Sequence, residues 1–79
     1  MEGNWFDFKN RRLYLEEDEI FQVHEHYVVY RNADYLRENY PHLTENEIMV
    51  IAWDWRDTEL KEGYSNEDAL EVMIERYEL

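Results

Sequence analysis

The chain has 79 residues and a formal net charge of −12, because 20 Asp and Glu stand against 8 Lys and Arg. Acidic segments that stay disordered are poor in aromatic residues, whereas this chain carries three Trp, seven Tyr and three Phe, so it predicts one folded domain over residues 1–79. The charge argues against binding to nucleic-acid phosphate or anionic lipid, and the absence of cysteine excludes disulfides and thiolate metal sites.

The N-terminal segment, residues 5–15, alternates apolar and polar side chains in a way that is typical of a short β-hairpin. Residues 9–12 lack the Asn-Gly or Asp-Gly pair that marks a tight hairpin turn, so a loop packed onto helices by its aromatic residues is an equal alternative. In the hairpin, the apolar side chains expected to pair across the strands are Phe6, Phe8, Leu13 and Leu15.

Residues 20–30 carry an apolar face at helical spacing, and the four acidic residues 16–19 before them complement a helix dipole. The same residues also alternate, with one interruption, as a strand would, and the helix is the favoured of the two interpretations. Asn32 is a candidate N-cap for a second, short helix over residues 33–39, which has to end before Pro41.

Thr44 and Glu47 have the spacing of a capping box, which predicts a helix over residues 45–61 with Gly63 as its stop. Ser65 is the expected cap of the last helix, which is predicted to run to the C-terminus. Since only a few residues separate these two helices, we expect an antiparallel pair. The sequence therefore predicts a mainly α fold, a small bundle of three to four helices with or without the N-terminal hairpin, and an α+β fold is the alternative.

Signatures of catalysis and of cofactor binding are missing from the sequence. Thr44 and Ser65 already have capping roles, and Gly3 and Gly63 are the only glycines, so neither a nucleophile set nor a phosphate-binding loop is indicated. We therefore expect a protein that is not an enzyme and that uses no cofactor.

The three histidines give no complete metal-ligand set. His24 and His26 are two residues apart and would point to opposite sides of a helix, whereas helical metal sites use a spacing of three or four residues. We expect His24 on the apolar face in its neutral form, His26 and His42 at the surface, and no metal site.

The last helix has the most regular charge pattern in the chain. At 100° per residue its acidic side chains fall within an arc of about 100°. Like charges four residues apart repel each other, and a face that serves only solubility normally mixes signs. The residues expected to face the core from the opposite arc are Ala69, Leu70, Met73, Ile74 and Tyr77. We interpret the acidic arc, together with the acidic run at 16–19, as a surface for a basic partner, with candidate contacts at Glu67, Asp68, Glu71, Glu75, Glu78, Glu16, Glu17, Asp18 and Glu19.

Trp53 and Trp55 lie two positions apart on a predicted helix, so a single neighbouring element cannot easily cover both. The favoured interpretation is a central helix between the N-terminal segment and the last helix, which buries both side chains. The other is an exposed tryptophan that anchors a partner or a second copy, with Trp53 as the candidate contact.

The leading functional hypothesis is a non-enzymatic acidic protein that occupies a basic surface of a partner protein, without direct contact to nucleic acid or membrane. Its sharpest form is a phage-encoded DNA mimic that inhibits a host nucleic-acid-binding or defence protein, of the anti-restriction or anti-CRISPR type. An immunity protein or antitoxin that neutralises a cationic toxin is the alternative, and a small metal-binding or regulatory protein using His24 and His26 is the second alternative. The oligomeric state is open, with a dimer as one possibility.

The expected location is the cytoplasm. No secretory signal pattern opens the chain, and its longest apolar run, residues 48–53, is far shorter than the roughly 20 residues of a membrane span.

Overall fold

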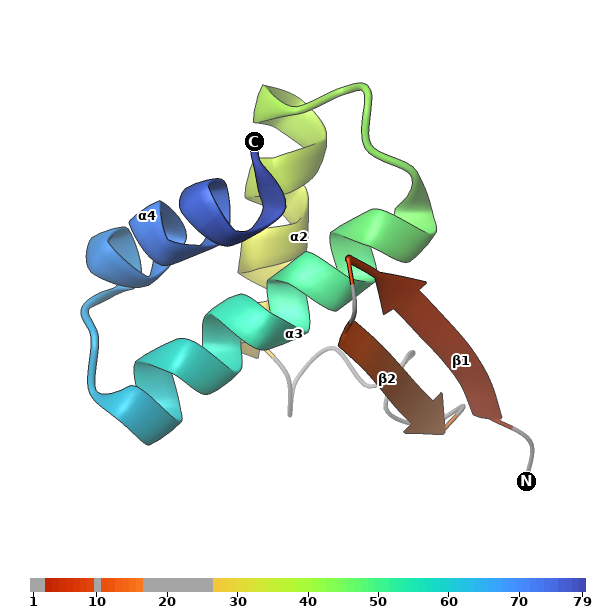
Figure 1. Cartoon of the computed structure of the whole chain (residues 1–79), viewed down its shortest axis with the longest axis horizontal. Coiled ribbons are helices and arrows are strands. Elements are labelled where there is room, and N and C mark those ends of the chain that lie inside the picture. The colour runs from red at the N-terminus through yellow and green to blue at the C-terminus, as the bar shows by residue number, and fades with distance from the viewer. Residues whose placement is uncertain (1–2, 10, 17–26) are drawn as a thin grey trace.

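The structure is a computed structural model of the chain, and it describes residues 3–9, 11–16 and 27–79. This part of the chain forms a two-stranded antiparallel hairpin followed by three helices (Figure 1). The prediction of a small, mainly helical domain is therefore confirmed, and the N-terminal hairpin is present. No helix within the described ranges combines the length and the apolar character that crossing a membrane requires.

The hairpin consists of β1 (Gly3–Phe8) and β2 (Arg11–Glu16), whose register pairs Phe6 with Leu13. The turn needs no Asn-Gly pair because Lys9 itself adopts a positive φ of 48°. Side chains alternate strictly between two faces, as the two-residue period of a strand requires. The face turned toward the helices is half-buried or buried and consists of Phe6, Phe8, Arg11, Leu13 and Leu15.

Helix α2 (Tyr27–Asn39) differs from the expected pair of short helices, because the helix runs through Asn32 without a break. Asn32 is not an N-cap: its side chain is 1% exposed, and its Nδ2 donates to the carbonyl oxygen of Ala52 at 3.4 Å. The residue is polar but faces the core, which explains why a local cap signal was misleading. Of the segment predicted at 20–30, residues 20–26 lie outside the described residues, and residues 27–30 are helical.

Helix α3 (Glu45–Glu62) begins and ends as the sequence predicts. The Thr44 hydroxyl accepts from the N–H of Glu47 at 3.1 Å, and the Glu47 carboxylate accepts from the N–H of Thr44 at 2.8 Å, which completes the capping box. Gly63 terminates the helix in the left-handed region with φ of 77°. Arg37 near the end of α2 forms two hydrogen bonds to the carboxylate of Glu45, at 3.1 and 2.8 Å, and so ties the end of α2 to the start of α3.

Helix α4 (Asn66–Tyr77) is capped by the Ser65 hydroxyl, which accepts from the N–H of Asp68. It ends two residues before the C-terminus, where Glu78 adopts a left-handed conformation. The chain turns back after Gly63, and α4 returns along α3 in the opposite direction (Figure 1), as expected for helices joined by a short loop.

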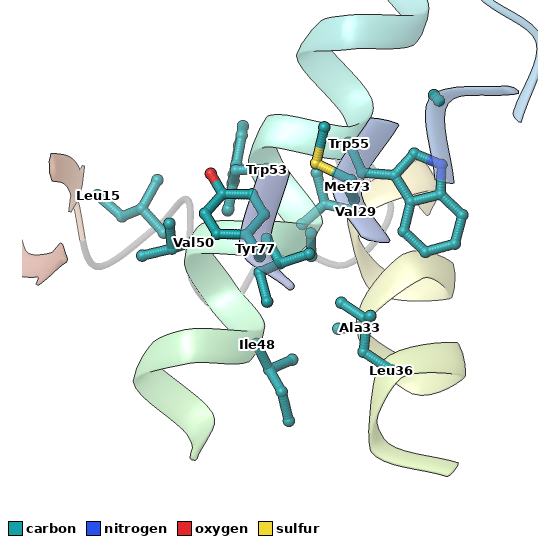
Figure 2. Packing of buried hydrophobic residues seen from close by; sticks show 13 residues of the cluster. Leu15, Val29, Ala33, Leu36, Ile48, Val50, Trp53, Trp55, Met73 and Tyr77 are labelled. Atoms are coloured by element: carbon teal, nitrogen blue, oxygen red, sulfur yellow. The ribbon is translucent and has the colours of Figure 1, made fainter. Parts of the chain in front are cut away.

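The core forms around α3, which contacts α2, α4 and the hairpin. Figure 2 shows the buried side chains as one cluster, to which the hairpin contributes Leu15, α2 contributes Val29, Ala33 and Leu36, and α4 contributes Met73 and Tyr77. Both tryptophans of α3 belong to it, with Trp53 7% and Trp55 2% exposed. The central position of α3 confirms the interpretation in which this helix lies between the N-terminal segment and the last helix.

A side-chain amide of α3 joins the hairpin to the helices at one strand edge. Asn46 Nδ2 donates to the carbonyl oxygen of Asp7 at 2.6 Å, and Asn46 Oδ1 accepts from the N–H of the same residue at 3.3 Å. Both main-chain groups of Asp7 are thus satisfied by one side chain, which fixes the position of β1 on the start of α3.

Candidate functional site

One exposed side of α4 carries a row of acidic residues, as the sequence predicts. Glu67, Asp68, Glu71 and Glu75 are all exposed, and we call these four residues the acidic face of α4. Their spacing repeats every three to four residues, so neighbouring carboxylates along the helix are about 6 Å apart. Within the described ranges no Lys, Arg or His forms an ion pair with any of the four.

The basic residues of the protein are engaged elsewhere, and all eight lie in the described part of the chain. Six form ion pairs with carboxylates outside the acidic face: Lys9, Arg11, Arg37, Arg56, Lys61 and Arg76. The other two, Arg12 and Arg31, lie over the rings of Trp5 and Tyr27 at 4.6 and 6.0 Å. The four carboxylates of the acidic face therefore have no basic partner within the described residues.

Glu78 does not belong to this uncompensated set, although its side chain is exposed. Its Oε2 accepts a hydrogen bond from Lys9 Nζ at 2.6 Å, and this bond and the positive charge of Lys9 lower the pKa of the Glu78 carboxyl. Glu78 thus differs from the other four candidate acids of the last helix, because a base compensates its charge. The pairing joins residues 69 positions apart, so nothing in the local sequence indicates it.

The apolar side of α4 is narrower than predicted. Ala69, Met73 and Tyr77 are buried, and Leu70 is half-buried, as expected. Ile74 is 36% exposed instead of buried, because it lies on the edge of the acidic face, three residues after Glu71.

Three of the four candidate acids at 16–19 lie outside the described residues. Glu16 is the last residue of β2, and Glu17, Asp18 and Glu19 lie outside the described residues. The candidate site is therefore built from α4 alone.

Trp53 is not an exposed anchor, and the hypothesis of an accessible tryptophan on α3 is wrong for both positions. The Trp53 ring is buried and lies 5.5 Å from the guanidinium of Arg56. Trp55 Nε1 donates to the carbonyl oxygen of Asn66 at 3.0 Å, which fastens the first residue of α4 to α3. The two indoles are covered because the hairpin, α2 and α4 surround α3 from several sides.

A charge network around a buried carboxylate, at the contact between α3 and α4, was not predicted from the sequence. Asp54 on α3 is 3% exposed, and both of its oxygens accept from Arg76 Nη1, at 2.9 and 2.7 Å. Tyr77 donates its hydroxyl to Asp54 Oδ2 at 2.5 Å, and the Arg11 guanidinium from β2 lies 3.9 Å from Asp54 Oδ1. The network joins β2, α3 and α4 around one carboxylate.

The pKa values of two members of this network follow from the geometry. Burial, and then the hydrogen bond to Asp54, raise the pKa of the Tyr77 hydroxyl above its usual range. The hydrogen bond to the same carboxylate raises the pKa of Arg76. Because the donors around Asp54 are positioned by core contacts, such as the stacking of Phe8 on Tyr77 at 5.4 Å, we interpret the network as structural.

The histidines give no metal site in the described part of the chain. His24 and His26 lie outside it, and His42 is exposed, with its ring 6.3 Å from that of Tyr40. No group of three or more His, Asp or Glu among the described residues is arranged to hold a metal ion.

A search with protein-family models found no match to the chain, and comparisons with curated proteins and with solved structures likewise found none.

Proposed function

We propose that this protein is a non-enzymatic binding protein that places the acidic face of α4 on a basic surface of a partner protein. The observation that carries the proposal is the separation of charges. The eight basic residues contact carboxylates outside the acidic face or aromatic rings, and four carboxylates on one helix face are left without a counter-charge in the described structure. A cluster of negative charges on a molecule of net charge −12 accelerates its association with a cationic surface and disfavours anionic partners.

The sharper form of the proposal is mimicry of a nucleic-acid backbone, which would make the partner a nucleic-acid-binding protein such as a host defence nuclease. Carboxylates about 6 Å apart along a helix have a spacing similar to that of phosphates along one strand. A well-anchored helix supports this form, because the capped start of α4 and the hydrogen bond from Trp55 to Asn66 fix the backbone that carries the four acidic residues. A cytoplasmic location belongs to the same proposal and is supported by the absence of cysteine.

The test compares two variants that each remove two negative charges. Glu71→Gln with Glu75→Gln removes two charges from the acidic face. It leaves Glu67 and Asp68, whose negative charges in the first turn stabilise the helix through its dipole. Glu38→Gln with Glu62→Gln is the matched control, because both side chains are exposed, lie outside the acidic face and take part in no ion pair within the described residues.

A partner is first captured on the immobilised wild-type protein and eluted with NaCl, and its association rate is then measured with the three proteins at two ionic strengths. The acidic-face variant should associate on the order of tenfold more slowly than the control variant at low salt, with a shallower dependence on salt. Equal rates for the two variants would remove α4 from the interface. If the captured protein binds duplex DNA but the wild-type chain does not displace that DNA, the mimicry form fails while the acidic interface stands.

A further inference from the structure

The outer face of the hairpin is an exposed surface that the proposed function does not use. It consists of the four side chains that alternate away from the helices, Trp5, Asp7, Arg12 and Tyr14, and we call this set the outer hairpin face. Trp5 is 59% and Tyr14 43% exposed, and their ring centroids lie 5.0 Å apart across the two strands. Trp, Tyr and Arg are the residue types that contribute most to protein–protein contacts.

The charges of this face are balanced, unlike those of α4. Asp7 and Arg12 are directly opposite each other in the register of the two strands, and both side chains are exposed. They form no ion pair with each other: the Arg12 guanidinium lies instead over the Trp5 ring, at 4.6 Å. On a molecule of net charge −12, the outer hairpin face thus carries one acid and one base, and neither forms an ion pair within the described residues.

We propose that the outer hairpin face binds a second copy of this chain in a symmetric dimer. A two-fold axis parallel to the strands places each residue of the face against the cross-strand neighbour of its counterpart. Because Asp7 pairs with Arg12 and Trp5 pairs with Tyr14 in the register, this axis sets Asp7 of one copy against Arg12 of the other, and Trp5 against Tyr14. The face is therefore complementary to itself in both charge and aromatic contact.

The size of the face and the charge of the molecule determine how strong this dimer is. Four side chains bury only a few hundred Å² per copy, below the roughly 800 Å² of a standard stable interface, so the dissociation constant is on the order of 0.1–1 mM. Two copies of charge −12 also repel each other, and salt screens this repulsion. The dimer should become stronger as salt rises, which is the opposite of the salt dependence expected for binding through the acidic face of α4.

The experiment is sedimentation equilibrium of the full chain at protein concentrations up to about 1 mM, at two ionic strengths, with charge-exchange variants. Asp7→Arg changes the net charge from −12 to −10, because one acid is lost and one base gained, and Arg12→Asp changes it to −14 by the reverse exchange. Each single exchange sets like charges against each other twice in the dimer and should weaken association by about tenfold. The double variant Asp7→Arg with Arg12→Asp restores both pairs and the original net charge, and should dimerise within about threefold of the wild type.

Opposite changes in net charge separate specific pairing from general repulsion, since repulsion alone would make Asp7→Arg dimerise more strongly. Tyr30→Ala is the control for an exposed aromatic residue elsewhere, on α2, and should leave the equilibrium unchanged. Circular dichroism confirms that each variant is folded. Three results would overturn the proposal. The wild type could stay monomeric at the highest concentration, the double variant could dimerise as weakly as the single variants, or none of the exchanges could change the dissociation constant. None of these results depends on the acidic face, so the two proposals fail or stand separately.

Discussion

At the scale of single residues, Asp54 shows how a negative charge is kept inside an already acidic molecule. An ionised carboxylate in the core costs several kcal/mol of desolvation unless charged or hydrogen-bonding groups compensate it. Here Arg76 and Tyr77 donate to its two oxygens, and Arg11 lies at 3.9 Å. Two of the eight basic residues, Arg11 and Arg76, thereby direct their charge at Asp54, which leaves the outward carboxylates of α4 with less compensation.

Tyr77 gives this network a pH dependence whose sign follows from its raised pKa. The folded state holds the hydroxyl proton that the unfolded chain releases near pH 10. The stability that this group contributes is therefore complete below about pH 10 and is lost as pH rises further. We predict that the free energy of unfolding of the wild type falls by about 1 kcal/mol more between pH 9 and pH 11 than that of Tyr77→Phe.

Urea unfolding at both pH values measures this difference. The other six tyrosines are present in both proteins and serve as the internal control. At pH 9 the Phe variant should be less stable by about 1 kcal/mol, the usual value of a lost hydrogen bond. Parallel pH profiles of the two proteins would contradict the inferred proton retention.

The residues of this network explain what the sequence could not predict of the site. Asp54 and Arg76 are 22 positions apart, and Lys9 and Glu78 are 69 apart, so their pairing depends on how the helices and the hairpin come together. The acidic face of α4 was predictable because it depends only on helical periodicity within one element. The burial of Trp53 was not decidable in this way, since it required the positions of three neighbouring elements.

At the scale of elements, Gly63 ends α3 and begins the loop that leads to α4. A glycine at such a position can be recognised from the sequence alone as a helix stop. Its φ of 77° is unfavourable for a residue with a Cβ, yet a Cβ built at this position has no atom within 4 Å. The cost of a substitution is therefore conformational and not steric. We predict that Gly63→Ala lowers the free energy of unfolding by about 1 kcal/mol.

Gly63→Asn is the matched comparison, because asparagine tolerates the left-handed region better than alanine does. It should lie between the wild type and the alanine variant in thermal melts. If alanine and asparagine have the same effect, the loss arises from the side chain's surroundings and the conformational explanation does not hold.

The elements that the sequence predicted well have starts and stops made by neighbouring residues. The capping box of Thr44, the cap at Ser65 and the stop at Gly63 all act within a few positions, so the bounds of α3 and α4 follow from local chemistry. The prediction of an N-cap at Asn32 was wrong because its side-chain amide donates to a carbonyl of α3. This is a tertiary contact that the neighbouring sequence does not indicate. The hairpin was left undecided because its turn uses Lys9 at positive φ in place of a turn-forming pair.

At the scale of the whole molecule, the net charge of −12 lowers the stability of the folded state, in addition to steering association with a partner. Compaction brings like charges together, and their repulsion is screened as the Debye length falls from about 30 Å at 0.01 M salt to about 8 Å at 0.15 M. The pair between the buried Asp54 and the partly exposed Arg76 is screened less than a fully exposed pair. We predict that the free energy of unfolding rises by on the order of 1 kcal/mol between these two ionic strengths.

Urea unfolding at the two salt concentrations tests this, with the Glu71→Gln and Glu75→Gln double variant as comparison. Removing two of the unpaired carboxylates should make the protein more stable at low salt and reduce the gain from added salt. A wild-type stability that falls with salt would instead mean that the surface ion pairs outweigh the repulsion.

The two hydrogen bonds between Asn46 and Asp7 have a consequence for how this protein can polymerise. A neighbouring strand would bond to the same N–H and carbonyl group of Asp7, so the amide of Asn46 takes the place that an incoming strand would need. Growth of an extended sheet, the step that leads to fibrils, is therefore blocked at this point of β1. A sheet that grew from the hairpin on both sides would need this edge of β1, and at Asp7 a side chain of the same molecule already occupies it.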